Sequence, residues 1–436
     1  MRTLSSALAA ALLLPACARP PAASRPNVLF VTVDTLRADH CSAYGYRRTT
    51  TPRLEALAGE GTRFETAYAP MPTTAPSHAT MFTALLPRSH GVLKNGQPLG
   101  PGPRTLAEVL HAAGYRTAAF VSAAPVDRHA GLGRGFDEYD DVPSERTGEV
   151  TRRRAEAWLA RHGYLRPRAD RHDERPFFVW VHLYDPHSPY LPPPAYAARF
   201  PSAPSASELE KAVDAYDGEV RFADAQVGAL VHHLDQAGRA SQTLVVVTAD
   251  HGEGLMDHGI MGHGLSLYEE TLRVPLVFRW PGTLPAKRVT EPVQLVDLAP
   301  TISELAGIQW TGTSPQGRSL AAILLGKEGA DPRREAFFQR RQYDTPVVDG
   351  FRIKGDKHAV RAGRWKYIVA PEEGTAELYD LVADPAERHD LRRDRVAEAD
   401  GLDALIKVWH RATARAPSLP VDEERARALR ALGYVQ

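Results

Sequence analysis

The chain has 436 residues, of which 43% are hydrophobic and 24% charged, and its 53 Lys and Arg residues balance 53 Asp and Glu residues. This length favours one large domain and a smaller one, since single hydrophobic cores stop growing near about 250–300 residues. The balanced charge argues against a nucleic-acid partner and against an anionic membrane surface. We therefore expect a small-molecule, lipid or glycan substrate. The oligomeric state is left open.

The N-terminus predicts a signal peptide over residues 1–16, with one arginine followed by an apolar run too short to span a bilayer. Its last letters, "LPAC", resemble a bacterial lipobox, in which Cys17 is lipidated and becomes the first residue. Cleavage of an ordinary signal near Ala16 or Ala18 is the alternative. Both predict export to the periplasm or cell surface. Residues 17–26 are a Pro-rich tether, and a lipid on Cys17 would be the only membrane contact.

Four near-continuous apolar runs predict strands buried on both faces of a parallel sheet. They are residues 27–34, 177–185, 243–250 and 274–280. Apolar residues recurring every three or four positions predict helices over 105–114 and 205–238, with Gly238 at a C-cap. Strands alternating with helices indicate an α/β sheet with helices on both faces. We expect a catalytic domain over 27–335 and a small α+β subdomain over 336–436.

Two strand ends supply the first candidate site. Asp34 ends the run 27–34, and Asp250 and His251 end the run 243–250. Because ligands bind at the carboxyl ends of strands in open α/β sheets, two carboxylates and an imidazole should share one edge. They predict a site for one divalent metal ion, with Mn or Zn favoured over Ca because Ca prefers an all-oxygen shell. The alternative is that each Asp only caps a helix.

The stretch "PTTAPSHAT", residues 72–80, contains the candidate nucleophile. Thr74, with Pro76 in the first turn, is predicted to be the N-cap of a helix. The free N–H groups of a helix N-terminus attract an anionic ester group. A metal ion lowers the pKa of a bound hydroxyl, so Thr74 can also act as nucleophile. Thr73 and Ser77 are rival nucleophiles.

Histidines and an aspartate crowd two further stretches, "VHLYDPHSPY" and "DHGIMGHG". The first holds His182, Asp185 and His187, and the second holds His258 and His263. Such side chains can bind the ester oxygens, protonate the leaving group or complete a second metal site. A structural role is the alternative for each of them.

Seven ordered stretches, from "NVLFVTVDTLRADH" to "ELYDLVADPAERHDL", resemble the landmarks of bacterial sulfatases in the alkaline-phosphatase-like superfamily. The resemblance runs from about residue 27 to 395. It implies an α/β/α sandwich with a mostly parallel sheet and a C-terminal subdomain built on a small antiparallel sheet.

The chain departs from sulfatases at the nucleophile. Their Cys or Ser, which is oxidised to formylglycine, is Thr74 here, and their arginine is His78, which we group with the catalytic residues. The methyl group on the Cβ of threonine prevents oxidation to an aldehyde, so no formylglycine is expected. The second aspartate of the first strand is Thr35, and two lysines of the family pattern are absent.

At these positions the chain resembles another branch of the superfamily, in which a metal-bound threonine attacks phosphoesters. The single-metal members of that branch imply Asp34, Thr74, Asp250 and His251 as metal ligands. The two-metal members imply His263 for a second metal. Their Asp with a His four residues later is not reproduced, since Asp185 and His187 are two residues apart.

Three functions follow. The sequence favours an exported metal-dependent hydrolase of a phosphoester (a monoester, diester or phosphonate ester), with Thr74 attacking and His187 or His263 protonating the leaving group. The first alternative is a sulfuric ester hydrolase that works without formylglycine. A threonine sulfate lacks the exit that an aldehyde hydrate provides, which counts against it. The second alternative is a non-catalytic, anion-binding surface lipoprotein.

Overall fold

A computed structural model of the chain describes residues 25–167, 175–329, 331–343, 347–348, 351–413, 415–432 and 434. The predicted signal peptide, Cys17 and most of the predicted tether lie outside the described residues. Among the residues that are described, no helix is long and apolar enough to cross a membrane.

A nine-stranded sheet forms the centre of the molecule, with strand order β10-β2-β9-β6-β1-β5-β3-β4 and β11 paired to β2. All its pairings are parallel except those of β9, which runs antiparallel to both neighbours. The strands β1, β5 and β6 are buried at every residue, which explains their near-continuous apolar sequences. The nine strands are β1 (Asn27–Val33), β2 (Thr62–Tyr68), β3 (Arg116–Val121), β4 (Glu138–Asp140), β5 (Phe177–Leu183), β6 (Thr243–Ala249), β9 (Arg273–Arg279), β10 (Lys287–Val289) and β11 (Val293–Gln294).

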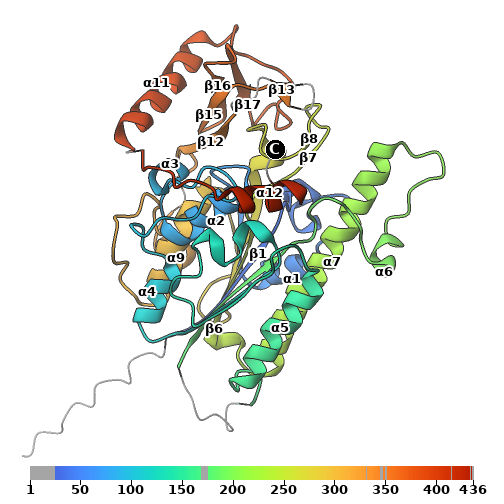
Figure 1. The fold of residues 1–436 in the computed structure, drawn as a ribbon, viewed down its shortest axis with the longest axis vertical. Coiled ribbons are helices and arrows are strands. Elements are labelled where there is room, and N and C mark those ends of the chain that lie inside the picture. Colours follow the sequence, from blue (N-terminus) through green and yellow to red (C-terminus); the bar gives the residue numbers. More distant parts are fainter. Residues whose placement is uncertain are drawn as a thin grey trace, which may run out of the picture.

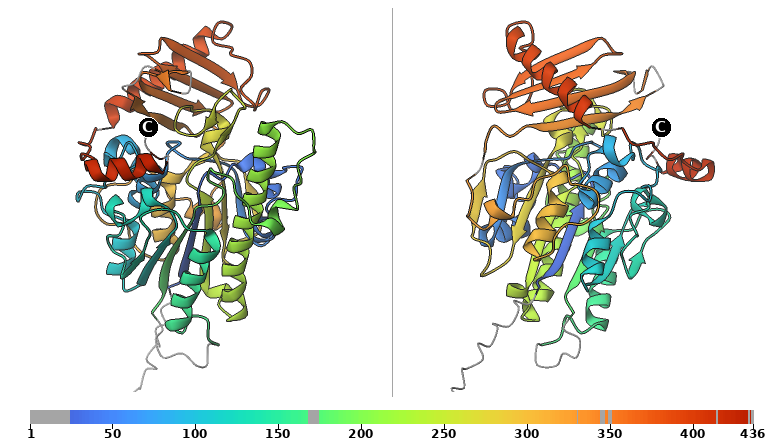
Figure 2. Two further views of the ribbon diagram at one scale, coloured as in Figure 1. Left: turned by 45° about the vertical axis from the view of Figure 1, so that its right-hand side comes forward. Right: turned by 90° about the vertical axis from the view of Figure 1, so that its left-hand side faces the viewer.

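Helices cover both faces of this sheet (Figures 1 and 2). On one face α7 contacts both α1 and α5, and on the other α2, α4 and α9 contact one another. The helices of this domain are α1 (Pro52–Glu60), α2 (Thr74–Thr83), α3 (Pro87–His90), α4 (Leu106–Ala112), α5 (Gly148–Arg161), α6 (Pro194–Ala197), α7 (Glu208–Gln236), α8 (Glu269–Leu272), α9 (Leu298–Leu305) and α10 (Ala321–Leu324).

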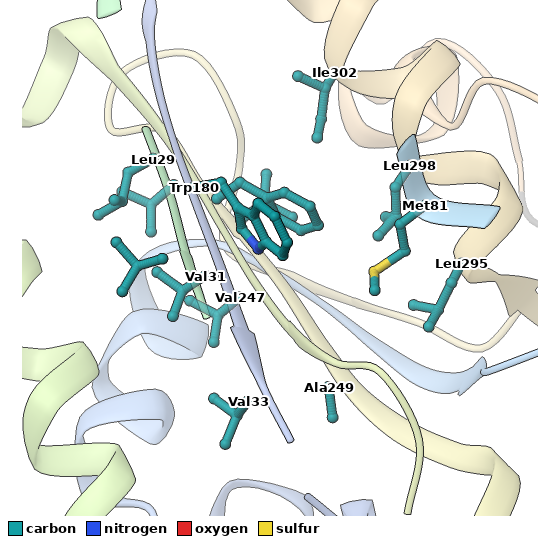
Figure 3. Close-up of a cluster of buried hydrophobic side chains, with 14 of the residues drawn as sticks. Leu29, Val31, Val33, Met81, Trp180, Val247, Ala249, Leu295, Leu298 and Ile302 are labelled. Atoms are coloured by element: carbon teal, nitrogen blue, oxygen red, sulfur yellow. The ribbon is translucent and has the colours of Figure 1, made fainter. Parts of the chain in front are cut away.

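The main core lies between the sheet and these helices. Figure 3 shows part of it, with aliphatic side chains of β1 and β6, the indole of Trp180 on β5, Met81 of α2, and Leu298 and Ile302 of α9. Burial of such apolar surface stabilises the fold by about 25 cal/mol per Å². The packed core thereby fixes the strand ends that carry the candidate site.

The C-terminal subdomain is a four-stranded antiparallel sheet of order β12-β15-β16-β17, with α11 (Val396–Ala412) packed against β15 and β16. Its strands are β12 (Ala336–Tyr343), β15 (Gly355–Ala362), β16 (Trp365–Ala370) and β17 (Thr375–Asp380). Two short ribbons accompany the sheets, β7 (Gly254–Leu255) with β8 (Met261–Gly262), and β13 (Val347–Val348) with β14 (Phe351–Arg352).

The last helix, α12 (Glu423–Ala431), leaves this subdomain and packs on the catalytic domain. Leu429 and Tyr434 belong to the main hydrophobic core, whose other buried members among the described residues all lie between Val28 and Leu324. The predicted subdomain 336–436 begins where β12 begins, but the end of the chain lies on the other domain.

The predicted α/β fold is confirmed: a mostly parallel central sheet with helices on both faces, plus a small antiparallel C-terminal sheet. The predicted helix from 205 to 238 is α7, capped by Ser207, which accepts a hydrogen bond from the N–H of Glu210. The prediction that Thr74 is an N-cap is wrong. Thr73 is the N-cap of α2 and Thr74 is its first helical residue, because the N–H of Ser77 already bonds to the carbonyl of Thr73.

Candidate active site

Asp34 and Asp250 lie side by side because β1 and β6 are adjacent parallel strands. Val33 is the register partner of Ala249, so the two residues that follow these strands meet at the same sheet edge. The N–H of Thr35 donates to Oδ1 of Asp250 at 3.2 Å, which links the two strand ends directly.

The turn after β1 is strained. Thr35 has a φ of 52°, in the left-handed region that a β-branched residue rarely occupies. Its carbonyl accepts a hydrogen bond from the hydroxyl of Tyr216 at 2.7 Å, and that same hydroxyl accepts from the N–H of Arg37 at 3.0 Å. Tyr216 therefore holds the strained turn in place, and such strain is concentrated at functional sites.

Thr74 joins these residues from the first turn of α2. Its Oγ1 lies 3.4 Å from Nε2 of His251, and that nitrogen lies 3.8 Å from Oδ1 of Asp34 and 3.6 Å from Oδ2 of Asp250. All four side chains are fully buried. The structure thus brings together the four residues predicted from sequence as metal ligands.

Three of the four carboxylate oxygens in this cluster lack a hydrogen-bond partner. They are both oxygens of Asp34 and Oδ2 of Asp250, whereas Oδ1 of Asp250 accepts from the N–H groups of Thr35 and His251. Burial, followed by the nearby charge of Asp250, raises the pKa of Asp34 well above its usual value. Buried carboxylate oxygens without partners are costly in a protein interior unless a cation binds between them. The donor set of Asp34, Asp250 and His251 has its ligand atoms within 4.8 Å of one another, which fits a metal ion.

His251 is oriented as a ligand. Its Nδ1 lies 2.8 Å from the carbonyl of Gly252, an acceptor, so the ring proton resides on Nδ1. Nε2 therefore carries a lone pair that points toward Thr74 and the two carboxylates. A backbone carbonyl that fixes the tautomer in this way is typical of metal-binding histidines.

His78 has a positioning role, unlike His251. Its Nδ1 lies 2.8 Å from the carbonyl of Thr74, and its Nε2 lies 3.1 Å from Oγ1 of Thr32. The indole of Trp180 donates to the same Oγ1 at 3.0 Å, so the Thr32 hydroxyl donates to His78. Both ring nitrogens are engaged, and burial lowers the pKa of His78. His78 holds the first turn of α2.

The N-terminus of α2 is less open than expected. The N–H of Ala75 donates to the side-chain oxygen of Asn95 at 2.9 Å, and Pro76 has no N–H. The hydroxyl of Ser77, a rival nucleophile in the sequence, donates to the carbonyl of Asp250 at 2.6 Å. The hydroxyl of Thr73, the other rival, is buried without a partner.

A second group of rings borders the cluster. The ring of His263 lies 4.5 Å from that of His251 and 5.2 Å from that of His187, measured between centroids. Nδ1 of His187 lies 2.7 Å from the carbonyl of Ser188, and its buried Nε2 has no partner. Burial lowers the pKa of His187 and of His263 to about 4 each.

His182 lies beside the cluster, whereas His258 lies outside it. His182 is buried at the end of β5 with both ring nitrogens unbonded, and its Nε2 lies 3.6 Å from Oδ2 of Asp34. His258 lies away from the cluster, with its Nδ1 2.8 Å from Glu270 and its ring stacked on Tyr268. The sequence assigned both histidines the same candidate roles, and only the tertiary structure distinguishes their surroundings.

Asp185 turns away from the metal ligands. Its Oδ2 accepts a hydrogen bond from the N–H of Gly148, the first residue of α5, at 2.7 Å. Burial raises the pKa of Asp185 to about 6. A second described group of potential ligands, His78, His182 and Asp250, also lies within 4.8 Å, but the nitrogens of His78 are already bonded.

Sequence reasoning missed Glu253. This carboxylate is fully buried, lies 3.0 Å from Nδ1 of His263 and accepts from the hydroxyl of Tyr190 at 3.1 Å. It follows the Asp250-His251 pair by two residues, and that spacing was the available signal. Asn95 was missed because nothing local links it to α2.

The fold and this buried cluster agree with the alkaline-phosphatase-like superfamily, to which sulfatases belong. A sequence model of the Sulfatase family matches residues 26–308, more than half of the chain, and the chain belongs to that family. A second family, N-sulphoglucosamine sulphohydrolase, C-terminal, matches residues 257–406.

Relatives with known names are sulfatases. Arylsulfatase A of Bos taurus is 29% identical over 444 residues, covering 88% of this chain and 80% of the relative. N-acetylglucosamine-6-O-sulfatase of Bacteroides thetaiotaomicron is 23% identical, covering 88% and 86%.

Solved structures share the fold. BT4656 in complex with its substrate D-glucosamine-2-N,6-O-disulfate superposes with a TM-score of 0.75 at 19% identity, covering 89% of this chain and 98% of that one. The phosphonate monoester hydrolase of Agrobacterium radiobacter superposes with a TM-score of 0.72 at 22% identity, covering 89% and 96%.

The chain is therefore a sulfatase-family hydrolase of anionic esters. The comparisons favour the sulfuric ester, the alternative in the sequence analysis, over the phosphoester that the sequence itself favours.

Proposed function

We propose that this chain hydrolyses a sulfuric ester with the hydroxyl of Thr74 as nucleophile and one divalent metal ion as cofactor. The carrying observation is the buried contact between Oγ1 of Thr74 and Nε2 of His251, 3.4 Å long, beside three carboxylate oxygens of Asp34 and Asp250 that have no hydrogen-bond partner. The relatives named as sulfatases support the sulfuric ester.

Asp34, Thr74, Asp250 and His251 would hold the metal ion. The orphaned oxygens of Asp34 and Asp250 and the free Nε2 of His251 are a donor set that fits a divalent cation. When bound, such an ion lowers the pKa of a hydroxyl and neutralises charge on the ester oxygens. The imidazole donor favours Mn or Zn, and the three oxygen donors keep Ca as a candidate.

The reaction has two displacements at sulfur. Oγ1 of Thr74 attacks, the new O–S bond forms, and the bond from sulfur to the leaving-group oxygen breaks. Water then attacks the sulfur of the threonine sulfate, sulfate leaves, and Thr74 regains its hydroxyl proton. No formylglycine takes part, since the Cβ of threonine carries a methyl group.

His187 or His263 would transfer the leaving-group proton in this scheme. Burial lowers the pKa of each ring to about 4, so the ring is neutral, and its Nε2 would first accept the proton that Thr74 loses and then give it to the departing oxygen. Each has a ring nitrogen that faces the cluster while its Nδ1 contacts a fixed acceptor, Ser188 for His187 and Glu253 for His263. A general acid contributes about 10²–10⁴-fold when it is held within hydrogen-bond reach of the departing oxygen. His78 acts through Thr74, because it holds the carbonyl of that residue.

A phosphoester is the second candidate substrate. Thr74 in place of the formylglycine precursor favours it, because a threonine phosphate is released by attack of water without any aldehyde chemistry. The structural likeness to a phosphonate monoester hydrolase is consistent with it. The leaving group in either case belongs to a small molecule, a lipid or a glycan.

Turnover of four p-nitrophenyl esters by the purified mature protein tests both candidates. They are the sulfate, the phosphate monoester, the bis-phosphate diester and a phenylphosphonate, each with added Mn, Zn or Ca and beside the Thr74→Ala variant. We expect the sulfate to be cleaved and the Thr74→Ala variant to be inactive. Cleavage of a phosphorus ester alone would select the second candidate, and activity that survives in Thr74→Ala would mean that Thr73 or Ser77 is the nucleophile.

Metal content tests the non-catalytic alternative. An anion-binding lipoprotein with a decayed site would copurify with little or no divalent metal, whereas we expect about one ion per chain. A second ion per chain would support a further site beside His263.

Export is part of the proposal. The signal peptide over 1–16 and the lipobox-like end at Cys17 support a periplasmic or surface protein anchored by a lipid. Radiolabelled palmitate should label the wild-type chain but not the Cys17→Ser variant. Export of an unlabelled wild-type chain would indicate an ordinary cleaved signal peptide instead.

A further inference from the structure

The C-terminal segment, residues 415–432 and 434, lies beyond both matched family regions, which end at residues 308 and 406. Figures 1 and 2 show its helix α12 against the catalytic domain instead of beside α11. The N–H of Ala416 donates to the carbonyl of Arg88 at 2.9 Å, at the start of this return path.

The C-terminal segment is anchored at several points. Arg425 forms an ion pair with Asp127 at 2.7 Å, with side chains only 14% and 3% exposed, and also donates to the carbonyl of Ala124. Leu429 is fully buried and packs over Gly96, where an added Cβ would meet it at 2.8 Å. Most described residues of this segment are exposed, but the buried side chains of Leu429 and Tyr434 and the ion pair of Arg425 fix it to the folded domain.

This anchoring delivers Tyr434 to the candidate active site. Its ring lies 5.0 Å from that of His187 between centroids, and the side chain is 6% exposed. Burial, followed by the charge of Asp34 and by the neighbouring Tyr184 and Glu145, raises the pKa of Tyr434 well above its usual value. The phenol therefore stays neutral next to the cluster.

The rings form a continuous path to the nucleophile. From Tyr434 it passes to His187, then 5.2 Å to His263, then 4.5 Å to His251, whose Nε2 lies 3.4 Å from Oγ1 of Thr74. An in-line displacement places the leaving group opposite the attacking oxygen, on the side of the residues that protonate it. That side is the one that His187 and Tyr434 border.

We propose that Tyr434 is a specificity-determining residue that forms a wall of the leaving-group subsite and selects esters whose leaving group is a ring. The inference rests on the proposed function for the position of the leaving group. The rings of Tyr434, His187 and Tyr184 pack on one another and form an aromatic cluster. A ring-shaped leaving group, aryl or pyranose, that reaches this cluster would gain stacking contacts that a small alkyl group cannot make.

Equilibrium binding of uncleavable analogues tests this inference on the complete metal-loaded protein. Benzylsulfonate and methanesulfonate carry the same charge, and their C–S bonds are not hydrolysed; benzylphosphonate and methylphosphonate form the matching phosphorus pair. We expect the benzyl compound of at least one pair to bind more tightly to the wild type. Tyr434→Ala should weaken that binding by about tenfold and change the methyl compound by less than about twofold.

Two variants sharpen the result. Tyr434→Phe keeps the ring and should retain the preference within about twofold, and Leu419→Ala, an exposed position of the C-terminal segment, should change nothing. An unchanged benzyl preference in Tyr434→Ala, or an equal loss for benzyl and methyl compounds, would overturn the inference. Because these ligands are not turned over, the inference can fail while esters are still hydrolysed. A wild type that binds neither pair would contradict the inference and the proposed function together.

Discussion

Oγ1 of Thr74 lies 3.4 Å from Nε2 of His251, although the two residues are 177 positions apart and come from a helix and a strand end. The Nδ1 proton of His251 is held by the carbonyl of Gly252, so the facing nitrogen has a free lone pair. A hydroxyl and an unprotonated imidazole, fully buried beside two carboxylates, form a site that a divalent cation would complete.

Substitutions at Thr74 distinguish the role of its hydroxyl as nucleophile from the role of its side chain in packing. Thr74→Ala should lower kcat for the cleaved ester by about 10³-fold or more, because the attacking oxygen is removed. Thr74→Ser keeps the oxygen and should stay within about tenfold of the wild type. Steady-state rates measure both, and trapping of a sulfated or phosphorylated peptide containing Thr74 by mass spectrometry identifies the intermediate. Equal loss in both variants would point to packing of the methyl group instead.

Removing a carboxylate should remove the metal. We expect Asp250→Asn to weaken metal binding by at least about 100-fold, since a charged ligand becomes neutral. At a free metal concentration of about 100 times Kd, the ion stabilises the wild type by about 2.7 kcal/mol, so a chelator should lower its Tm but not that of the variant. The control is Asp235→Asn, which removes only the partly exposed ion pair with Arg279. A chelator effect that persists in Asp250→Asn would contradict the assigned ligands.

His90 should make stability depend on pH. Its Nδ1 accepts the N–H of Val92 at 3.1 Å, which requires a neutral ring, and burial lowers its pKa to about 3. Between the unfolded value near 6.5 and the folded value near 3, the unfolded chain binds a proton that the folded chain does not. The free energy of unfolding contributed by His90 therefore falls as pH falls, by about 1.4 kcal/mol per pH unit.

Urea unfolding at a series of pH values measures this slope. His90→Asn, which keeps an acceptor for Val92, should reduce the slope over pH 3–6.5 by about one proton. The exposed His111→Gln is the matched control and should leave it unchanged. Parallel slopes for wild type and His90→Asn would show that His90 is protonated in the folded protein.

Lys366 ties the two domains together electrostatically. This fully buried ammonium on β16 lies 3.0 Å from Glu269 of the catalytic domain and 2.9 Å from Glu387. Lys366→Met should lower the free energy of unfolding by about 3–5 kcal/mol, because it leaves buried carboxylates unpaired. Lys407→Met breaks an exposed pair with Asp403 and should leave the free energy of unfolding nearly unchanged. Calorimetry compares them, and a second Glu387→Gln change should recover part of the loss.

The sequence by itself determined the elements and the chemistry that they carry. Apolar runs marked β1, β5 and β6 because strands buried on both faces have no polar side to maintain. Asp34 and the Asp250-His251 pair were identified as ligands because they follow two of these runs. Such patterns are local, so they can be read without coordinates.

The strand order, and the separation of cluster residues from the other candidates, could be found only in the tertiary structure. The sequence does not state that β1 pairs with β6 or that β9 is antiparallel, because strand order depends on packing between distant segments. The same limit explains why Asp185 caps α5, why His258 lies outside the cluster and why Thr73 is the N-cap of α2.

Tyr434 shows this dependence on tertiary structure most clearly, because a tyrosine near the end of a chain carries no local signal of function. It reaches His187 because Arg425 and Leu429 anchor the C-terminal segment on the catalytic domain. Residue types and their spacing give the chemistry available to this protein. The non-local packing of its core determines which groups share one buried site.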